Sequence, residues 1–295
     1  MEESRHPESG TIRRPALAKT LGIRIAVGAV LIPVVLALTY TGGWAYAIFV
    51  GLLAALGSYE LLAMAARADV RPSRTLGIVG SAAVAVSFRW PDHVLPGIVL
   101  AVAVLAVLVE RLVRSTKERY LWEVSLTCLA LLYPGALLGY FVWLRDAPVV
   151  AQGVGGGPIG TGTSLVYFVL ILTWSYDSFA YLAGSSLGRH KLFPRISPSK
   201  TVEGLFGGLA GSVAAALICR ATFVTFIGAA EAVLLGVALG IIAQIGDVAE
   251  SMMKRSTGAK DSSNLIPGHG GFLDRFDSLL FTGPAFYFYA RLALC

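Results

Sequence analysis

Apolar segments recur along almost the whole of this chain, each separated from the next by a short polar stretch. Nine of them lie at about residues 25–40, 44–64, 75–88, 94–109, 123–144, 164–183, 204–227, 231–248 and 278–294. Most approach the roughly 20 residues with which a helix crosses a bilayer, although the third and fourth are short. Because a backbone in lipid must satisfy its own hydrogen bonds, these segments predict helices. We therefore expect an all-α fold, a polytopic transmembrane helix bundle of about nine spans.

Composition excludes a soluble core. The chain of 295 residues is 56% hydrophobic and only 14% charged, whereas a soluble domain carries about 25% charged residues. Residues 1–20 are polar and predict a disordered cytoplasmic tail. We divide the remainder into N-terminal transmembrane helices at 21–145 and a C-terminal catalytic transmembrane domain at 146–295, because the acidic helix ends and the polar loops lie in the second half.

The positive charges predict the orientation. With the N-terminus in the cytoplasm, 20 of the 24 Lys and Arg residues fall on the inner side, which is the side that such residues favour. The net charge of +6 therefore has a topological explanation, and no long basic stripe is present to bind nucleic acid. The two polar loops of the second half then face the cytoplasm. The compact size and the lack of an evident organelle-targeting peptide favour a bacterial cell inner membrane.

The densest polar stretch runs from Ser251 to Asp277, and four carboxylates cluster in or beside it: Asp247, Asp261, Asp274 and Asp277. Asp274 and Asp277 are three residues apart and share a helix face, while Asp247 ends the preceding span. Hard oxygen ligands with a single His and no Cys suit Mg²⁺, with a second cation possible.

Positive side chains lie in the same stretch: Lys254, Arg255, Lys260 and Arg275. Together with Mg²⁺, they are the usual means of stabilising charge on a transferred phosphoryl or nucleotidyl group. The alternative is that these are solvated loop charges of the inner side. For His269, a structural hydrogen bond and a catalytic role both stay open.

A second polar loop offers hydroxyls and a cation at Ser197, Lys200 and Thr201. Thr201 is placed to cap a helix that starts near Glu203, and a helix N-terminus binds phosphate. The alternative is that this loop is only a turn and a cap. Asp177 lies inside the sixth apolar segment, either as a structural hydrogen-bonding group or as a carboxylate that faces the site.

The stretch Ser251–Asp277 resembles the signature of the phosphatidate cytidylyltransferases, or CDP-diacylglycerol synthases. That signature reads S-x-x-K-R-x4-K-D-x-x-x-x-[LI]-P-x-H-G-G-x-x-D-R-x-D, and this chain does not depart from it. The resemblance extends upstream through Trp174–Tyr181, Gly184, Gly188–Lys191 and Ser197–Gly204, so that it covers about residues 170–280. The first 150 residues match only as a generic set of spans.

The resemblance implies a reaction in which CTP and phosphatidic acid give CDP-diacylglycerol and pyrophosphate. It implies Asp247 and Asp274 as metal ligands, with Asp277 and Asp261 as ligands or as groups behind them. Lys260 and Lys254 would neutralise the triphosphate with help from Arg255 and Arg275, while His269 would assist the leaving pyrophosphate or fix its loop. Ser197, Lys200 and Thr201 would hold the lipid phosphate or the nucleotide, and Asp177 would face the same site.

Two other functions stay open at this point. A CTP-dependent lipid or prenol kinase of the membrane would share the acidic and basic loops, but it would transfer the γ-phosphoryl group. A cation-coupled transporter would carry its acidic residues near mid-membrane in two matching halves, whereas here the acidic residues lie at helix ends. The expected partners are the two substrates and the lipid bilayer, and a homodimer is left open.

Overall fold

The computed structural model describes residues 14–67, 70–147, 160–263 and 270–294, with side chains from residue 27 on. Within these residues the chain forms nine helical rods, and each coincides with one of the nine apolar segments. The rods are α1 (Arg14–Thr41), α2 (Gly43–Arg67), α3 (Arg74–Ser87), α4 (Val94–Arg114), α5 (Tyr120–Ala130) continued by η1 (Leu131–Ala136) and α6 (Leu137–Asp146), α7 (Thr161–Leu187), α8 (Val202–Thr222), α9 (Ala229–Ser256) and α10 (Leu273–Ala293).

The expected disorder of residues 1–20 does not hold for the part that the structure describes. Residues 14–20 belong to α1, and residues 1–13 lie outside the described residues. Hydrophobic residues after Pro15 extend the helical pattern of the first apolar segment toward the N-terminus. The predicted segment boundary at residue 25 did not include these residues.

Six of the rods are long and apolar enough to cross a membrane: α2, α4, the α5–η1–α6 rod, α7, α8 and α9. Large apolar side chains on α4 are exposed at its outer face, namely Val102, Leu105, Val109 and Leu112. Such a face suits lipid rather than water, because soluble proteins rarely expose a continuous apolar surface. The chain is therefore an integral, multi-pass membrane protein.

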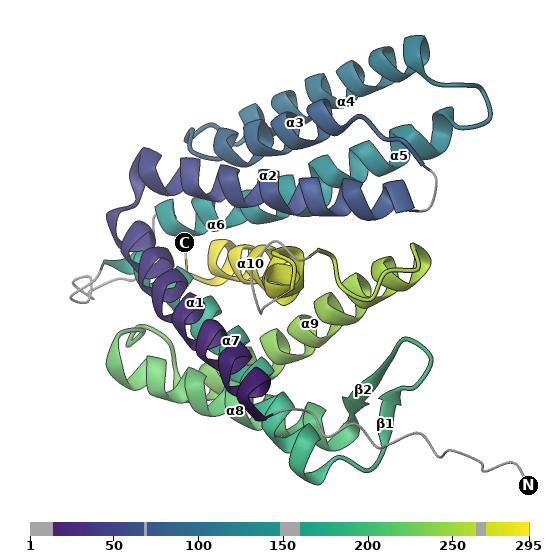
Figure 1. Ribbon diagram of the computed structural model, residues 1–295. Helices are drawn as coiled ribbons and strands as arrows, with labels where there is room; N and C mark the ends of the chain where they lie inside the picture. The colour runs from purple at the N-terminus through teal and green to yellow at the C-terminus, as the bar shows by residue number, and fades with distance from the viewer. Residues whose placement is uncertain (1–13, 68–69, 148–159, 264–269, 295) are drawn as a thin grey trace, which may run out of the picture.

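The rods form two layers with α10 between them. Figure 1 shows α2 to α6 in the upper layer and α7 to α9 in the lower one, while α1 crosses between the layers and contacts α2 and α7. Helix α10 packs against α9, α6, α7 and α2. Leu279, Leu280 and Phe286 of α10 are buried, which makes this helix the centre of the core.

A π-helical turn joins α5 to α6 at Leu131–Ala136 and contains Pro134. Proline has no backbone N–H and its ring disturbs the regular helix ladder, so a wider turn at this position has a physical cause. The rod still continues across it, because the backbone N–H of Leu137 at its far end bonds back to the carbonyl oxygens of Leu132 and Pro134. The predicted segment 123–144 is thus one span with an irregular centre.

The one departure from an all-α fold among the described residues is a small hairpin. Strand β1 (Lys191–Phe193) pairs antiparallel with β2 (Ser197–Thr201), with Lys191 opposite Thr201 and Phe193 opposite Ser197. The segment that joins α7 to α8 is too short and too rich in turn residues to form a helix. Pro198 is compatible with an edge strand. The fold is therefore all-α, with this short hairpin as a local addition that the sequence did not indicate.

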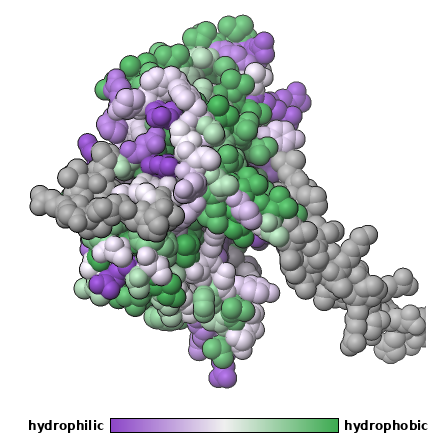
Figure 2. Space-filling model, turned by 90° about the vertical axis from the view of Figure 1, so that its left-hand side faces the viewer, coloured by the Kyte–Doolittle hydropathy of each residue, from purple (hydrophilic) through white to green (hydrophobic). Residues whose placement is uncertain are grey.

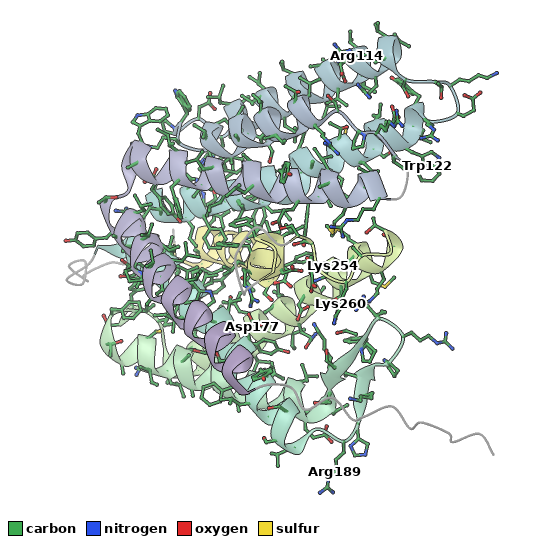
Figure 3. All side chains as sticks on the ribbon, viewed as in Figure 1. Arg114, Trp122, Asp177, Arg189, Lys254 and Lys260 are labelled. Carbon is green, nitrogen blue, oxygen red and sulfur yellow. The ribbon has the colours of Figure 1, made fainter. Side chains whose placement is uncertain are left out.

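The Lys- and Arg-rich helix ends gather at one end of the molecule. In Figure 1 the C-terminal ends of α2, α4, α7 and α9 and the β1–β2 hairpin all lie on the right, and Figure 3 places Arg114, Arg189, Lys254 and Lys260 on that side. Figure 2 looks at the opposite end and shows hydrophilic residues in patches among hydrophobic ones that reach the outline. We call the end where these Lys- and Arg-rich helix ends lie the basic end of the molecule.

Candidate active site

A cavity of about 540 Å³ lies between α7, β2, α8, α9 and α10, toward the basic end of the molecule. Eight of the predicted site residues line it: Asp177, Lys200, Thr201, Asp247, Lys254, Asp274, Arg275 and Asp277. They come from four separate segments of the second half, and the fold brings them to one place. Asp177, for which two roles were open, lies on the cavity wall.

Helices α9 and α10 approach closely at Gly246, beside Asp247. A Cβ at this position would lie 2.7 Å from the carbonyl oxygen of Asp277 and 3.2 Å from the Cα of Ser278. Only glycine lets two helix backbones come this near without a shift of one of them. The close crossing brings Asp247 of α9 and Asp277 of α10 to the same cavity.

The β1–β2 hairpin brings Lys200 and Thr201 to the opposite wall. Thr201 is the N-cap of α8, and its hydroxyl accepts a hydrogen bond from the backbone N–H of Gly204 at 3.1 Å. The predicted cap is therefore confirmed. Next to it, the ammonium of Lys200 lies 2.5 Å from a carboxylate oxygen of Asp247, which joins the hairpin to α9 across the cavity.

Lys254 is held between two carboxylates at the end of α9. Its ammonium contacts Glu250, one turn earlier, and lies 2.6 Å from Oδ1 of Asp274. Glu250 is fully buried. A buried carboxylate requires a nearby positive charge, so Lys254 has a structural partner as well as a place in the cavity. The sequence interpretation did not include Glu250, although its spacing of four residues from Lys254 is the ordinary sign of a helical ion pair.

Asp274 fixes the start of α10. Its Oδ2 accepts hydrogen bonds from the backbone N–H of Ser262 at 3.1 Å, from the Ser262 hydroxyl at 3.0 Å and from the N–H of Gly271 at 3.0 Å. Since Oδ1 receives Lys254, both oxygens are engaged. Asp274 would bind a metal ion only by exchanging its contact with Lys254.

Glu60 of α2 is a residue that the sequence interpretation missed. Its carboxylate is fully buried and accepts from the backbone N–H groups of Phe272 and Leu273 at 2.8 and 2.7 Å. The available signal was a lone acidic residue inside the apolar segment 44–64, because an ionisable group in a span is costly unless it has partners. The first half of the chain therefore reaches the site through this side chain.

Several predicted site residues do not line the cavity. Lys260 and Asp261 are exposed, and Ser197 places its hydroxyl 3.4 Å from that of Ser199 on the hairpin. Arg255 donates to the carbonyl groups of Ile196 and Ala259, both at 3.3 Å, so it ties the hairpin to the end of α9. His269 lies outside the described residues.

The four predicted metal ligands do not form a ready metal site. Among the residues that the structure describes, no three side chains of His, Cys, Asp and Glu are close enough together to hold a metal ion as they stand. Two of the carboxylates contact lysines instead: Lys200 lies on Asp247 and Lys254 on Asp274. Asp261 is turned to solvent.

The donor chemistry of the cavity does fit a hard cation. Its described lining contains carboxylate oxygens but neither Cys nor His, and oxygen ligands are those that Mg²⁺ prefers. Asp277 lies close enough to Asp177 and Asp247 for their charges to repel it. Within the described lining, three cationic side chains face four carboxylates. Charge repulsion from the carboxylates opposes the binding of anionic substrates, and an added cation would offset it.

The cavity wall also carries polar groups suited to a ligand. Gln244 Nε2 is buried and has no hydrogen-bond partner within the described part of the chain. Leaving a buried donor unpaired costs about 1–3 kcal/mol, and such groups call for an explanation in a native structure. Binding of a polar ligand in this cavity is one such explanation.

Comparisons with known proteins find relatives over most of the chain. Residues 22–293 match the cytidylyltransferase family. A phosphatidate cytidylyltransferase of Bacillus subtilis is 39% identical over 170 residues, which are 58% of this chain and 59% of that relative. Phosphatidate cytidylyltransferases of Synechocystis and Pseudomonas aeruginosa are 33% and 36% identical over 92% and 89% of this chain, and the matches span 97% and 94% of their own lengths.

Proposed function

This chain belongs to the cytidylyltransferase family, and we propose that it transfers a cytidylyl group from CTP to phosphatidic acid in the cavity between α7, α8, α9 and α10. As a phosphatidate cytidylyltransferase, it is a nucleotidyltransferase of phospholipid biosynthesis. The observation that carries the location is the cavity itself, because it gathers eight of the predicted site residues at the basic end of the membrane bundle.

The reaction joins two anions. A phosphate oxygen of phosphatidic acid forms a bond to the α-phosphorus of CTP, and the bond from that phosphorus to the bridging oxygen breaks. Pyrophosphate leaves with the electron pair. The attacking oxygen is already anionic, so no proton has to be removed from it. The residues of the site must therefore hold the two substrates in line and offset their mutual repulsion.

Lys200, Lys254 and Arg275 supply the positive side chains of the cavity. A phosphate group that takes the ammonium of Lys200 releases Asp247, and one that takes Lys254 releases Asp274. Substrate binding and the freeing of carboxylates are thereby linked. Gln244 offers a further N–H donor on the same wall, while Thr201 keeps the start of α8 in place.

Mg²⁺ is the cation that suits the freed carboxylates. Asp247, Asp274 and Asp277 would hold it, with Asp177 nearby on the wall. When bound, it supplies positive charge between the triphosphate and the lipid phosphate. Asp261 and Lys260, which the sequence placed in this group, lie at the surface and have no assigned role in the transfer.

The orientation follows from the basic end. The N-terminus and the cavity lie on the cytoplasmic side, where CTP is found, and the chain crosses a bacterial cell inner membrane about nine times. The acyl chains of phosphatidic acid stay in the bilayer while the head group enters the cavity. The Lys and Arg residues at the ends of α2, α4 and α9 support this orientation.

Purified protein in detergent tests the proposal with CTP labelled on either its α- or its γ-phosphate, together with phosphatidic acid and Mg²⁺. We expect α-label in the lipid and one pyrophosphate released for each lipid product, and we expect a chelator to stop both. Lipid that carries γ-label but no α-label would show a kinase instead. Absence of any labelled lipid with active reference enzyme alongside would also contradict the proposal.

A further inference from the structure

The carboxylate of Glu60 contacts residues at both ends of the connection between α9 and α10. Glu60 is fully buried in α2, and it accepts hydrogen bonds from the hydroxyls of Ser262 and Ser263 and from the N–H groups of Phe272 and Leu273. Every one of these partners is neutral. Glu60 therefore forms no ion pair among the described residues. Its four hydrogen bonds hold the donor groups of this connection in place.

Two of these donors belong to the first turn of α10. The N-cap position of that helix is Phe272, whose side chain offers no hydrogen bond to the helix. The first N–H groups of a helix have no partner within it, and a negative charge near them is favourable. Glu60 thus caps α10 from another helix, more than 200 residues away in the sequence.

The same contacts lead to Asp274. The hydroxyl oxygen of Ser262 lies 2.9 Å from Oε2 of Glu60 and 3.0 Å from Oδ2 of Asp274. A Cβ on Gly271 would lie 1.7 Å from this hydroxyl oxygen and 2.8 Å from Oε2 of Glu60. The packing admits no side chain at position 271, so the two carboxylates are held on either side of Ser262.

Asp274 in turn contacts Lys254 at 2.6 Å in the cavity. A continuous set of hydrogen bonds therefore runs from α2 through Ser262 to the site. A glutamine at position 60 would keep one acceptor oxygen, but its amide NH₂ would face donors. All four partners place a donor atom beside this carboxylate, and a carboxylate offers them two acceptor oxygens where an amide offers only one.

We propose that Glu60 is a positioning residue of the transfer reaction, which holds Asp274 and the start of α10 in place at the cavity through Ser262 and the N–H groups of Phe272 and Leu273. This inference rests on the proposed function for the role of Asp274. The contact itself does not depend on that function, so it can be measured without any assay of catalysis.

The experiment compares Glu60→Gln, Ser262→Ala and the double variant with Glu123→Gln in the full-length protein. Glu123 is also a buried acidic residue of the first half, but its partner is Arg111 at 3.3 Å and it does not touch the loop. We measure amide hydrogen exchange at Phe272 and Leu273, the kcat and KM for each substrate, and the unfolding temperature. Glu60→Gln should raise exchange at both amides and lower kcat at least tenfold, with KM for CTP changed less than threefold.

The double variant tests whether the two residues act together. If Glu60 acts through Ser262, adding Ser262→Ala to Glu60→Gln should lower kcat by much less than the product of the two single effects. Glu123→Gln should leave amide exchange at 272–273 and kcat at wild-type values even where its unfolding temperature falls. Unchanged exchange in Glu60→Gln, or a loss of kcat that Glu123→Gln reproduces at equal loss of stability, would overturn the proposal.

The outcomes also separate this inference from the proposed function. Wild-type protein without cytidylyl transfer contradicts the proposed function, and with it the catalytic role of Asp274. Amide exchange at Phe272 and Leu273 then still decides whether Glu60 holds the start of α10. Normal transfer by the wild type together with unaltered kcat in Glu60→Gln would reject the positioning role alone.

Discussion

Asp247 and Asp261 were both predicted metal ligands, but only Asp247 lines the cavity, where it contacts Lys200. The two residues therefore form a matched pair for testing the site. Asp247→Asn should lower kcat about 10²–10³-fold, the range seen when one charge-stabilising group is removed, with little change in unfolding temperature because the side chain is partly open. Asp261→Asn should keep wild-type activity. Steady-state cytidylyl transfer measures both, and equal losses in the two variants would place the site elsewhere.

Lys254 allows a structural role to be separated from a catalytic one. Lys254→Met leaves buried Glu250 without its cation, and breaking a buried ion pair in this way costs about 3–5 kcal/mol. Adding Glu250→Gln removes the unpaired charge. The double variant should therefore recover most of the lost unfolding temperature while its transfer activity stays at least tenfold low.

Thermal unfolding in detergent and transfer assays on both variants check this prediction. Recovery of activity together with stability would mean that Lys254 serves the fold alone. Lack of recovery in either property would mean that the contact between Lys254 and Asp274, rather than the one with Glu250, carries the stability.

At this scale the sequence identifies residues by type and spacing but not by the direction of their side chains. The density of charge in and beside Ser251–Asp277 pointed to a loop next to the cavity, yet it could not separate Asp247 and Asp277 on the wall from Asp261 at the surface. Glu60 was missed for a different reason. Its partners lie more than 200 residues away, and no local pattern shows which distant loop a buried carboxylate meets.

Among the elements, the crossing of α9 and α10 has the tightest steric requirement. Gly246→Ala would press a methyl group against the backbone of Asp277 and Ser278, which cannot move without a shift of α10. We expect a loss of about 1–3 kcal/mol in stability, as overpacking usually causes. Transfer activity should fall by more than the folded fraction, because Asp277 moves with the backbone.

Gly97→Ala in α4 is the control for this variant, because nothing lies within 4 Å of a Cβ at that position. Alanine is favoured over glycine in a helix by about 1 kcal/mol, so Gly97→Ala should be as stable as wild type or more so, with full activity. The unfolding temperature and the specific activity of the two variants are the measurements. Equal behaviour of both would show that the crossing at Gly246 has room to spare.

Helices were easier to predict than their connections. All nine apolar segments coincide with helical rods, because length and hydrophobicity decide where a backbone can satisfy itself in lipid. The β1–β2 hairpin was not predicted, since its strands have three and five residues and include Pro198. The pairing of these strands depends on where α7 ends and α8 begins in space. It also depends on Glu203, whose carboxylate lies 2.7 Å from His190 Nδ1 across the connection.

For the whole molecule, the two layers have different relations to the site. The second half lines the cavity completely within the described residues, while the first half packs on α10 and reaches the site loop through Glu60. Similarity to a known signature pointed to the second half as the part of the chain that lines the cavity. The support that the first half gives the site depends on tertiary contacts, so the division at residue 145 describes the lining but not the support of the site.

The orientation of the bundle is the property of the whole molecule that remains to be tested. Ser186 near the end of α7 and Thr225 after α8 are both exposed and lie toward opposite ends of α8. In a variant whose three cysteines are replaced, Ser186→Cys should be protected from a membrane-impermeant thiol reagent in intact cells, whereas Thr225→Cys should react. Both should react after permeabilisation, which controls for local access.

The expected difference in labelling between the two cysteines has a direct physical basis. The Lys and Arg residues that surround Ser186 resist transfer across the membrane, while the α8–α9 connection near Thr225 has few of them. Reaction of Ser186→Cys alone in intact cells would invert the bundle and move the cavity away from cytoplasmic CTP. Reaction of both cysteines would mean that α8 does not span the bilayer, and the arrangement of about nine crossings would have to be abandoned.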